Sequence, residues 1–404
     1  MDALKLVAVL AAIVIALRKK VPVGITLFGA GVVTALLYGL NLLVLLNGYW
    51  ELIKSERFIS LTAIVVSITI LGALLKELGY LTKLTAACRR LPGGGRTAAT
   101  VLPTLVGLMP MPGGSLLSAP LVDNVLAEGK HSPEFKLITN YWFRHIAEFC
   151  WPIYPGLILT EALTGMPIYK VSLLQMPMTF VMASVGLIFI TRKIELAGSD
   201  SVDTIKALGG IAGAIWPIAL AIGLYAIFKL ELAIAVVVAL VLVSLLTRPE
   251  TARLKAAFKE GISIKLVFLV FGILSFQTSL ELTGAIKSIP TIASSLNLPA
   301  ELVIFLVCFA AGMLTGMVAA YVGLGYTLLA SYLYQPQIVP SHIFLAYISG
   351  FLGIILSPTH LCLILTNEYF GSDLLKVYRK FTVPVLIVFA IGLIIYISPW
   401  PEMF

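Results

Sequence analysis

Residues 141–165 read YWFRHIAEFCWPIYPGLILTEALTG, and residues 347–371 read YISGFLGIILSPTHLCLILTNEYFG. The second stretch follows the first at a constant offset of 206 positions, and a tyrosine, a proline, the run Leu-Ile-Leu-Thr and a glycine recur in register. Both stretches are apolar, and proline interrupts each at the corresponding place. Corresponding interrupted segments in two hydrophobic halves are typical of the substrate site of inverted-repeat transporters. We therefore predict two inverted repeats, residues 1–195 and 205–404.

The composition of the chain indicates that lipid is its solvent. Of the 404 residues, 59% are hydrophobic and only 12% are charged, and the mean hydropathy is +1.02. A soluble domain carries roughly 25% charged residues, so we expect an all-α, multi-pass protein of the cell membrane. The net charge of +8 does not indicate nucleic acid, because the cations stand between hydrophobic runs, where they set the orientation of a membrane protein.

Twelve apolar segments divide the chain, with boundaries near 3–17, 22–47, 58–79, 98–127, 137–165, 168–191, 207–228, 230–247, 264–284, 300–335, 342–369 and 381–398. Ten of them are predicted to cross the membrane. The segments 98–127 and 300–335 are long and carry Gly, Pro or small residues near their centres, which favours re-entrant hairpins that line a cavity. Each repeat then holds five crossings and one hairpin, and the broken helices are 137–165 and 342–369.

The distribution of Lys and Arg predicts the orientation of the chain. With the amino terminus outside and each hairpin returning to its own side, 21 of these residues face the cytoplasm, 6 face outward and Arg144 lies within a span. Positive charge gathers on the cytoplasmic side of membrane proteins. We therefore expect both termini outside the cell, with the first hairpin entering from the cytoplasm and the second from the external side.

The stretches GLMPMPGGSLLSAP at 107–120 and NYWFRH at 140–145 resemble the DUF401 family of prokaryotic integral membrane proteins. The two opposed hairpins, each followed by a broken helix, resemble the ion transporter superfamily, which includes divalent-anion/sodium symporters and citrate and gluconate permeases. That resemblance implies an alternating-access transporter of anions, and a homodimer.

In the carboxylate symporters of that superfamily, a Ser-Asn-Thr motif at each hairpin tip helps to bind sodium and carboxylate. The corresponding tips are predicted here at Pro112-Gly113-Gly114-Ser115 and Gly323-Leu324-Gly325-Tyr326-Thr327. Ser115 and Thr327 supply hydroxyl groups, but no asparagine accompanies them. The alignment of Ser115-Leu116-Leu117 with Thr327-Leu328-Leu329 shifts the offset from 206 to 212 in the hairpins.

Polar residues cluster in the first broken helix. Asn140, Arg144 and Glu148 are spaced to share one helix face, and His145 adjoins them. An ionisable group inside the bilayer normally faces a cavity or a partner. In one interpretation, Arg144 attracts an anionic substrate and Glu148 holds Arg144 or carries a proton. In the other, the two form an ion pair near the cytoplasmic end, with Arg144 reaching to the interface.

Ser357-Pro358-Thr359-His360 occupies the matching break in the second half. Proline exposes a carbonyl there, and carbonyl and hydroxyl oxygens suit sodium, so Na+ is predicted at Ser115, Ser357 and Thr359. The ordinary pKa of histidine, about 6.5, makes His360 a candidate proton carrier, although a lone histidine in an apolar helix is often a hydrogen-bonded core residue.

These observations define the candidate residues. The predicted substrate-binding residues are Pro112, Gly113, Gly114, Ser115, Asn140, Arg144, Gly325, Tyr326, Thr327 and Thr359. The predicted ion-coupling residues are Glu148, Ser357, Thr359 and His360. No cofactor is expected beyond Na+ or H+ as the coupling ion.

The leading hypothesis is a secondary transporter of a small, carboxylate-like anion. The alternative is a Na+/H+-type antiporter on the same scaffold, with Glu148 and His360 as the exchanging groups. An enzyme is not expected, because the chain holds no H-E-x-x-H, G-x-S-x-G or G-x-x-x-x-G-K-[ST] motif, and its four histidines are dispersed. The four cysteines form no C-x-x-C pair, and Cys88, Cys150, Cys308 and Cys362 are interpreted as small buried hydrophobes.

Overall fold

The computed structural model describes residues 2–88, 90–92, 94–108, 114–127, 131–194 and 203–404, and every regular element in these ranges is a helix. Five helical segments of the described chain are long and apolar enough to cross a membrane: Glu56–Glu77, Ile168–Lys193, Thr204–Phe228, Thr251–Thr283 and Leu374–Tyr396. Shorter apolar helices accompany them. The all-α prediction is confirmed, and the helices are those of a membrane protein.

The predicted crossing 22–47 is two helices, α2 (Val23–Leu37) and α3 (Leu42–Lys54). The chain turns between them at Gly39, whose φ of +73° favours glycine. The side chain of Asn41 then caps α3 by accepting a hydrogen bond from the amide of Leu43 at 2.8 Å. The local turn and cap therefore override the continuous apolar pattern.

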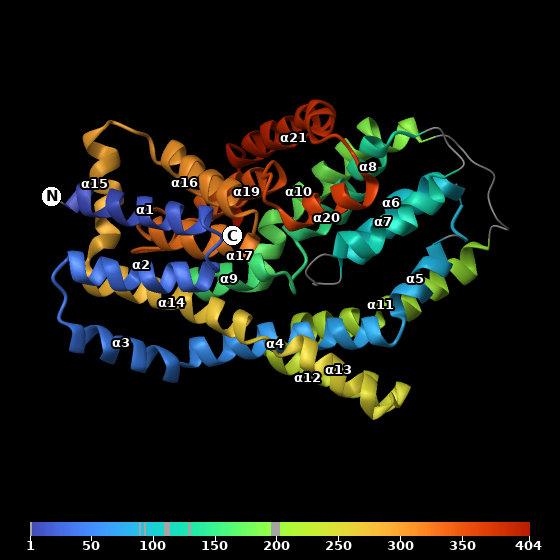
Figure 1. Cartoon of the computed structure of the whole chain (residues 1–404), viewed down its shortest axis with the longest axis horizontal. Helices are drawn as coiled ribbons and strands as arrows, with labels where there is room; N and C mark the ends of the chain where they lie inside the picture. The colour runs from blue at the N-terminus through green and yellow to red at the C-terminus, as the bar shows by residue number, and fades with distance from the viewer. Residues whose placement is uncertain (1, 89, 93, 109–113, 128–130, 195–202) are drawn as a thin grey trace.

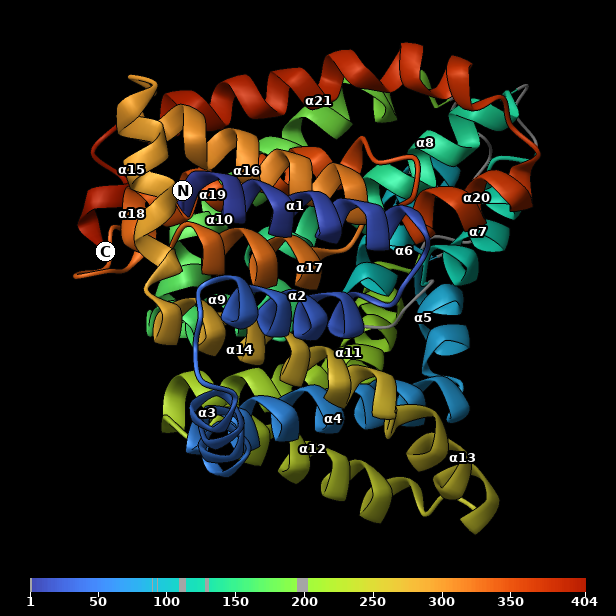
Figure 2. The same cartoon turned by 60° about the vertical axis from the view of Figure 1, so that its left-hand side comes forward.

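The helices form two groups, each built from both halves of the sequence (Figures 1 and 2). The scaffold group contains α2, α3, α4 (Glu56–Glu77), α5 (Tyr80–Cys88), α11 (Thr204–Phe228), α12 (Leu232–Thr247), α13 (Thr251–Gly261) and α14 (Ile264–Thr283). The site group contains α6 (Gly94–Gly107), α7 (Gly114–Val125), α8 (Pro133–Arg144), α9 (Pro155–Thr164), α10 (Ile168–Phe189), α16 (Ala300–Thr315), α19 (Pro340–Ile355), α20 (Leu361–Phe370) and α21 (Leu374–Tyr396). In Figure 2, α21 lies along one edge and α12 and α13 lie along the opposite edge. The helix α1 (Asp2–Arg18) packs on α2, α15 (Ser288–Ser295) and α16.

Glycines allow the closest helix pairs within each group. In the scaffold group, a Cβ added at Gly272 of α14 would lie 2.1 Å from the carbonyl oxygen of Gly24 in α2. In the site group, a Cβ added at Gly353 of α19 would lie 2.3 Å from the carbonyl oxygen of Phe309 in α16. Small residues at such contacts let backbones approach and gain dispersion energy, which is how helices associate in lipid.

Two helices of the site group are interrupted in the same manner. The helix α8 ends at Arg144, a 3-10 turn η1 (Ile146–Phe149) follows, and α9 begins at Pro155 after the break. The helix α19 ends at Ile355, and α20 begins at Leu361 after the break around Pro358. Proline lacks an amide and collides with the preceding turn, so neither helix can continue through Pro152 or Pro358. Each short second helix ends at a left-handed glycine, Gly165 with φ +75° and Gly371 with φ +60°.

Corresponding tyrosines tie the two breaks together reciprocally. The hydroxyl of Tyr141 in α8 donates to the carbonyl of Ile355, where α19 ends, at 3.1 Å. The hydroxyl of Tyr347 in α19 donates to the carbonyl of Glu148 in η1 at 2.8 Å. These tyrosines are the first residues of the two repeated stretches, 141–165 and 347–371. Each broken helix therefore satisfies a carbonyl that the break in the other one leaves without a helical partner.

The helices α6 and α7 pack side by side, and residues 109–113 between them lie outside the described chain. In the second half, α16 ends at Thr315 and the chain turns at Gly316, which has φ +61°. After this turn the chain packs back against α16, and we call this segment the returning limb. It consists of α17 (Val318–Tyr321), a π-helical turn η4 (Val322–Tyr326) and α18 (Ala330–Leu333). The predicted tip at 323–327 is thus within the returning limb, because the left-handed turn falls at the glycine that precedes it.

Candidate functional site

The guanidinium of Arg144 lies at the junction of α7, α8 and η1. The residue is only 3% exposed, and its Nη1 lies 3.6 Å from Oε1 of Glu148. The same nitrogen donates to the hydroxyl of Tyr154 at 3.3 Å. A Cβ added at Gly114, the first residue of α7, would lie 3.0 Å from Nη2 of Arg144. The ion pair with Glu148 is present, as predicted from the spacing, and Arg144 does not reach the protein surface.

A hydrogen-bond network connects the start of α7 to α8 and α20. The hydroxyl of Ser115 donates to the carbonyl of Cys362 at 3.2 Å. The amide nitrogen of Asn140 donates to the carbonyl of Ser115 at 2.9 Å and to Oγ1 of Thr366 at 3.4 Å. Ser115 and Asn140, both predicted from the sequence, therefore meet beside the second break, and all four residues are buried.

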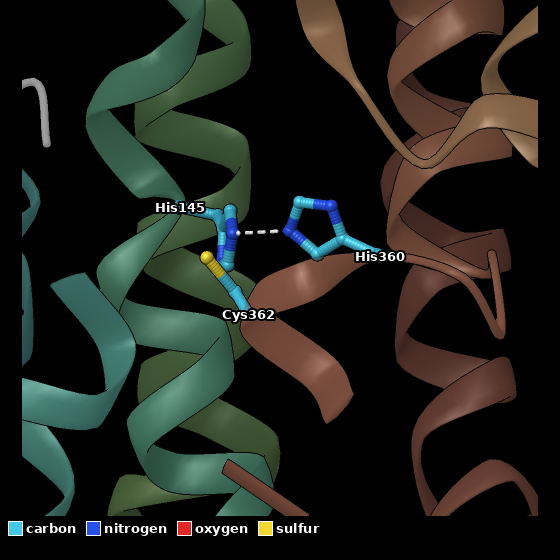
Figure 3. A group of neighbouring side chains, drawn as sticks. All are labelled: His145, His360 and Cys362. Atoms are coloured by element: carbon cyan, nitrogen blue, oxygen red, sulfur yellow. Dashed lines mark hydrogen bonds between the residues drawn. The ribbon is translucent and has the colours of Figure 1, made fainter. Parts of the chain in front are cut away.

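His145, His360 and Cys362 converge at the centre of the site (Figure 3). His145 caps the end of α8, His360 precedes α20, and Cys362 lies in the first turn of α20. Nε2 of His145 lies 3.0 Å from Nε2 of His360. One nitrogen of each ring and the sulfur of Cys362 all lie within 4.8 Å of one another.

Local backbone geometry holds both imidazole rings. At the end of α8 the amide of His145 bonds the carbonyl of Trp142, so the carbonyl of Tyr141 is left for the ring, at 2.5 Å from Nδ1 of His145. Nδ1 of His360 lies 2.6 Å from the carbonyl of Gly316, at the turn after α16. Since a carbonyl only accepts, both Nδ1 atoms donate. The two Nε2 atoms are thereby directed at each other.

Oxygen atoms surround the second break. The hydroxyl of Ser357 donates to the carbonyl of Met313 at 2.7 Å and lies 2.8 Å from Oγ1 of Thr359. The hydroxyl of Thr359 donates to the carbonyl of Leu314 at 3.4 Å. These carbonyls belong to the last turn of α16, the negative end of its helix dipole. The group presents hard oxygen atoms, which are the ligands that Na+ accepts.

Other predicted residues lie elsewhere. The hydroxyl of Tyr326 donates to the carbonyl of Ile343 at 3.3 Å, and the hydroxyl of Thr327 donates to the carbonyl of Gly323 at 2.6 Å. A Cβ added at Gly325 would lie 3.0 Å from the sulfur of Cys308 in α16. Tyr326 therefore contacts α19, Gly325 faces α16, and the hydroxyl of Thr327 bonds within the returning limb. Pro112 and Gly113 lie outside the described residues.

A cavity of 450 Å³ separates α5 from α7. Its lining includes Leu117 and Leu121, which lie on the same helix as Gly114 and Ser115. The scaffold side of the lining includes Lys76 and Thr82. The cavity therefore leaves one face of α7 without close packing against the scaffold group.

Sequence reasoning missed Cys362, Tyr154 and Thr366 as parts of the site. A thiol in an apolar run has the appearance of a core residue, and Cys362 was interpreted in that way. The signal that could have identified it is its position two residues after His360, in the first turn after a predicted break. A side chain that can hydrogen-bond or bind an ion at that place points toward the space that the break encloses.

The comparisons with known proteins give one result for the whole chain. A family model described as "Protein of unknown function (DUF401)" matches residues 3–398. No curated protein matches the chain.

Proposed function

The chain belongs to the DUF401 family and has the apolar helices of a membrane protein, and from these premises we propose that it is a secondary active transporter of a small carboxylate-like anion. A gradient of Na+ or H+ would drive transport by alternating access. The observation that carries the proposal is the buried guanidinium of Arg144 between two helix breaks. A cation in an apolar interior is costly and marks a substrate path or a functional partner.

The surroundings of Arg144 suit an anion. The helix α7 begins at Gly114 against the guanidinium, and the hydroxyl of Ser115 joins it to the first turn of α20 through the carbonyl of Cys362. Two helix amino termini therefore meet beside one buried cation. Helix amino termini present free amides and the positive end of the dipole, and both favour carboxylate. Glu148 balances the charge of Arg144 when no substrate is bound.

Sodium is the coupling ion that the oxygen group at the second break favours. Ser357, Thr359 and the carbonyls of Met313 and Leu314 provide hard oxygen atoms at the carboxyl end of α16. The hydroxyl of Ser115 lies across the site on α7 and belongs to the proposed sodium-binding set. Proton coupling is the alternative, and the imposed gradient distinguishes the two.

The proposed architecture is an inverted repeat of residues 1–195 and 205–404 in the ion transporter superfamily, with re-entrant hairpins at 98–127 and 300–335. The reciprocal hydrogen bonds of Tyr141 and Tyr347 support it, since corresponding residues make corresponding contacts across the breaks. We place the protein in the cell membrane as a homodimer with both termini outside. Movement of the site group against the scaffold group would alternate access, and the cavity beside α7 gives room for it.

The test is uptake of radiolabelled carboxylates into proteoliposomes under an imposed Na+ or H+ gradient. We expect accumulation of at least one member of a broad panel with the wild type. Arg144→Gln is expected to abolish uptake, and Arg144→Lys to retain a part of it, because a point charge replaces a fork of donors. Folded wild-type protein that moves no anion under either gradient would contradict the proposal.

The same vesicles test the antiporter alternative. A pH-sensitive dye inside them reports proton movement when a Na+ gradient is applied without any anion. A signal under these conditions, with no uptake of any carboxylate, would indicate cation/proton exchange on the same scaffold. Uptake that depends on Na+ and leaves the dye unchanged would support sodium symport.

A further inference from the structure

Three metal-ligating side chains, those of His145, His360 and Cys362, meet at the break before α20 (Figure 3), and Glu148 lies beside them. One ring nitrogen of each histidine and the sulfur of Cys362 lie within 4.8 Å of one another, and all three residues are buried. Oε1 of Glu148 lies 3.9 Å from Nε2 of His145. Two imidazoles, a thiol and a carboxylate form a donor set typical of transition metals, whereas sodium and magnesium favour oxygen alone.

The hydrogen bonds of the two rings leave their Nε2 atoms available as ligands. Each Nδ1 donates to a backbone carbonyl, that of Tyr141 or that of Gly316. A neutral ring that donates from Nδ1 carries a lone pair on Nε2, so two lone pairs face each other across 3.0 Å. They repel unless an electrophile stands between or beside them. A backbone carbonyl that orients the other ring nitrogen is also the usual outer partner of a metal-bound histidine.

The carboxylate of Glu148 supplies a second, independent observation. Its Oε2 atom is buried and has no hydrogen-bond partner among the described residues. A buried carboxylate oxygen without a partner costs free energy comparable to a lost hydrogen bond, or more because it is charged. A bound proton between the rings would explain the imidazole pair alone. A metal ion explains the rings, the thiol and the Oε2 atom of Glu148 together.

We propose that His145, Glu148, His360 and Cys362 bind one divalent first-row transition ion of the zinc class. Two ligands of a tetrahedral zinc at 2.0–2.1 Å are about 3.3 Å apart for two nitrogens, close to the 3.0 Å between the Nε2 atoms. The thiol must approach further, and it gives up its proton to solvent as it binds the ion. The thiolate balances one charge of the ion, and Glu148 shares its carboxylate between the ion and Arg144, which lowers the cost of burying the ion.

The ion would join the two broken helices. His145 and Glu148 follow α8 of the first half, while His360 and Cys362 belong to the break of the second half. Both helix breaks lie in the site group. The ion would therefore hold the walls of the site together without linking them to the scaffold group. The inference concerns binding in the resting protein and does not depend on which solute is moved.

The experiment uses the full chain in detergent, purified without a metal-chelating tag, stripped with a chelator and then reloaded. Zinc is measured by elemental analysis after removal of free ion, and we expect a single bound ion per chain. Loading with Co2+ instead is expected to give the visible absorption of a tetrahedral site and a thiolate-to-cobalt charge-transfer band. Addition of Zn2+ should abolish both signals by competition.

Variants assign the ligands. Cys362→Ser is expected to remove the charge-transfer band, and Cys308→Ser, at another buried cysteine of the second half, to retain it. His360→Gln should weaken zinc binding by at least the roughly 10–100-fold that loss of an outer-shell partner costs. Size-exclusion profiles and circular dichroism establish that each variant is folded. The cobalt titration of the wild type needs no variant and therefore tests the site even if a variant fails to fold.

Three outcomes would overturn the proposal. The first is wild-type protein that retains no zinc after reloading. The second is a cobalt spectrum without a thiolate band. The third is a band that survives in Cys362→Ser but is lost in Cys308→Ser. Failure of anion uptake with the cobalt spectrum intact would instead count against the transport proposal alone, so the two remain distinguishable.

Discussion

Arg144 and Glu148 are buried as a pair, at 3.6 Å, so their contributions to stability and to function can be separated by mutation. Arg144→Gln leaves a buried carboxylate without its cation, which is expected to lower the stability by about 3–5 kcal/mol. Adding Glu148→Gln removes that unpaired charge and should restore most of the loss. The midpoint of thermal unfolding, measured on chelator-treated protein in detergent, checks this order.

When the same variants are ranked by anion uptake, the order should differ from their order by the midpoint of thermal unfolding. If Arg144 attracts the anion, the double variant recovers its unfolding midpoint and still transports nothing. If the pair were only structural, the double variant would recover uptake together with stability. The comparison therefore separates the two interpretations that the sequence leaves open. Glutamine at position 148 keeps the side-chain size, and at position 144 it keeps a polar end on a shorter side chain.

At the scale of the helix, two glycines end α16 and α20 with nearly the same backbone angle but different surroundings. Gly316 has φ +61° and Gly371 has φ +60°. A Cβ at Gly316 would lie 2.7 Å from the Cα of His360, whereas a Cβ at Gly371 meets no atom within 4 Å. Gly371→Ala should therefore cost only the left-handed strain, about 1–2 kcal/mol.

Gly316→Ala carries the same strain and a backbone collision in addition. It is expected to lower the thermal midpoint clearly more than Gly371→Ala, and to weaken zinc binding because it displaces the carbonyl that orients His360. Equal midpoints for the two variants would show that α16 does not turn against the second break. Gly371→Ala is the matched control, since it has the same residue change, angle and position after a helix.

The turn at Gly316 lies closer to the tip that the offset of 206 predicts than to the tip that the offset of 212 predicts. The offset of 206 that aligns the broken helices places the counterpart of the first predicted tip, 112–115, at 318–321, two residues after Gly316. The local similarity of Ser115-Leu116-Leu117 to Thr327-Leu328-Leu329 shifted the offset to 212 and moved the predicted tip to 323–327. A gapless register over 25 residues carries more information than a match of three residues.

The metal-ligating cluster could not be predicted in the same way. The cluster joins His145 to His360, which are 215 residues apart in the sequence, and no helical period or motif spacing connects them. They meet because His145 ends α8, His360 precedes α20, and the two breaks pack against each other. A repeat predicts that two breaks exist, whereas the side chains that meet between them depend on how the helices cross.

For the molecule as a whole, the division into a site group and a scaffold group predicts that a covalent link between them stops transport. The turn η4 packs on α9, α16 and α19 of the site group. A Cβ at Gly323 in η4 would lie 2.7 Å from a side-chain carbon of Ile273 in α14, so the two positions face each other across the groups. The variant with cysteine at both positions is expected to form a disulfide, since bridged Cβ atoms are about 3.5–4.5 Å apart.

Oxidation of that variant should abolish uptake, and a thiol reductant should restore it, because closure and opening require the groups to move. The cobalt spectrum should stay unchanged throughout, since its four ligands lie in one group. The control is Gly323→Cys alone, treated with the same oxidant. Full uptake by protein shown to be cross-linked would mean that the two groups move as one body and that access alternates by local opening near the breaks.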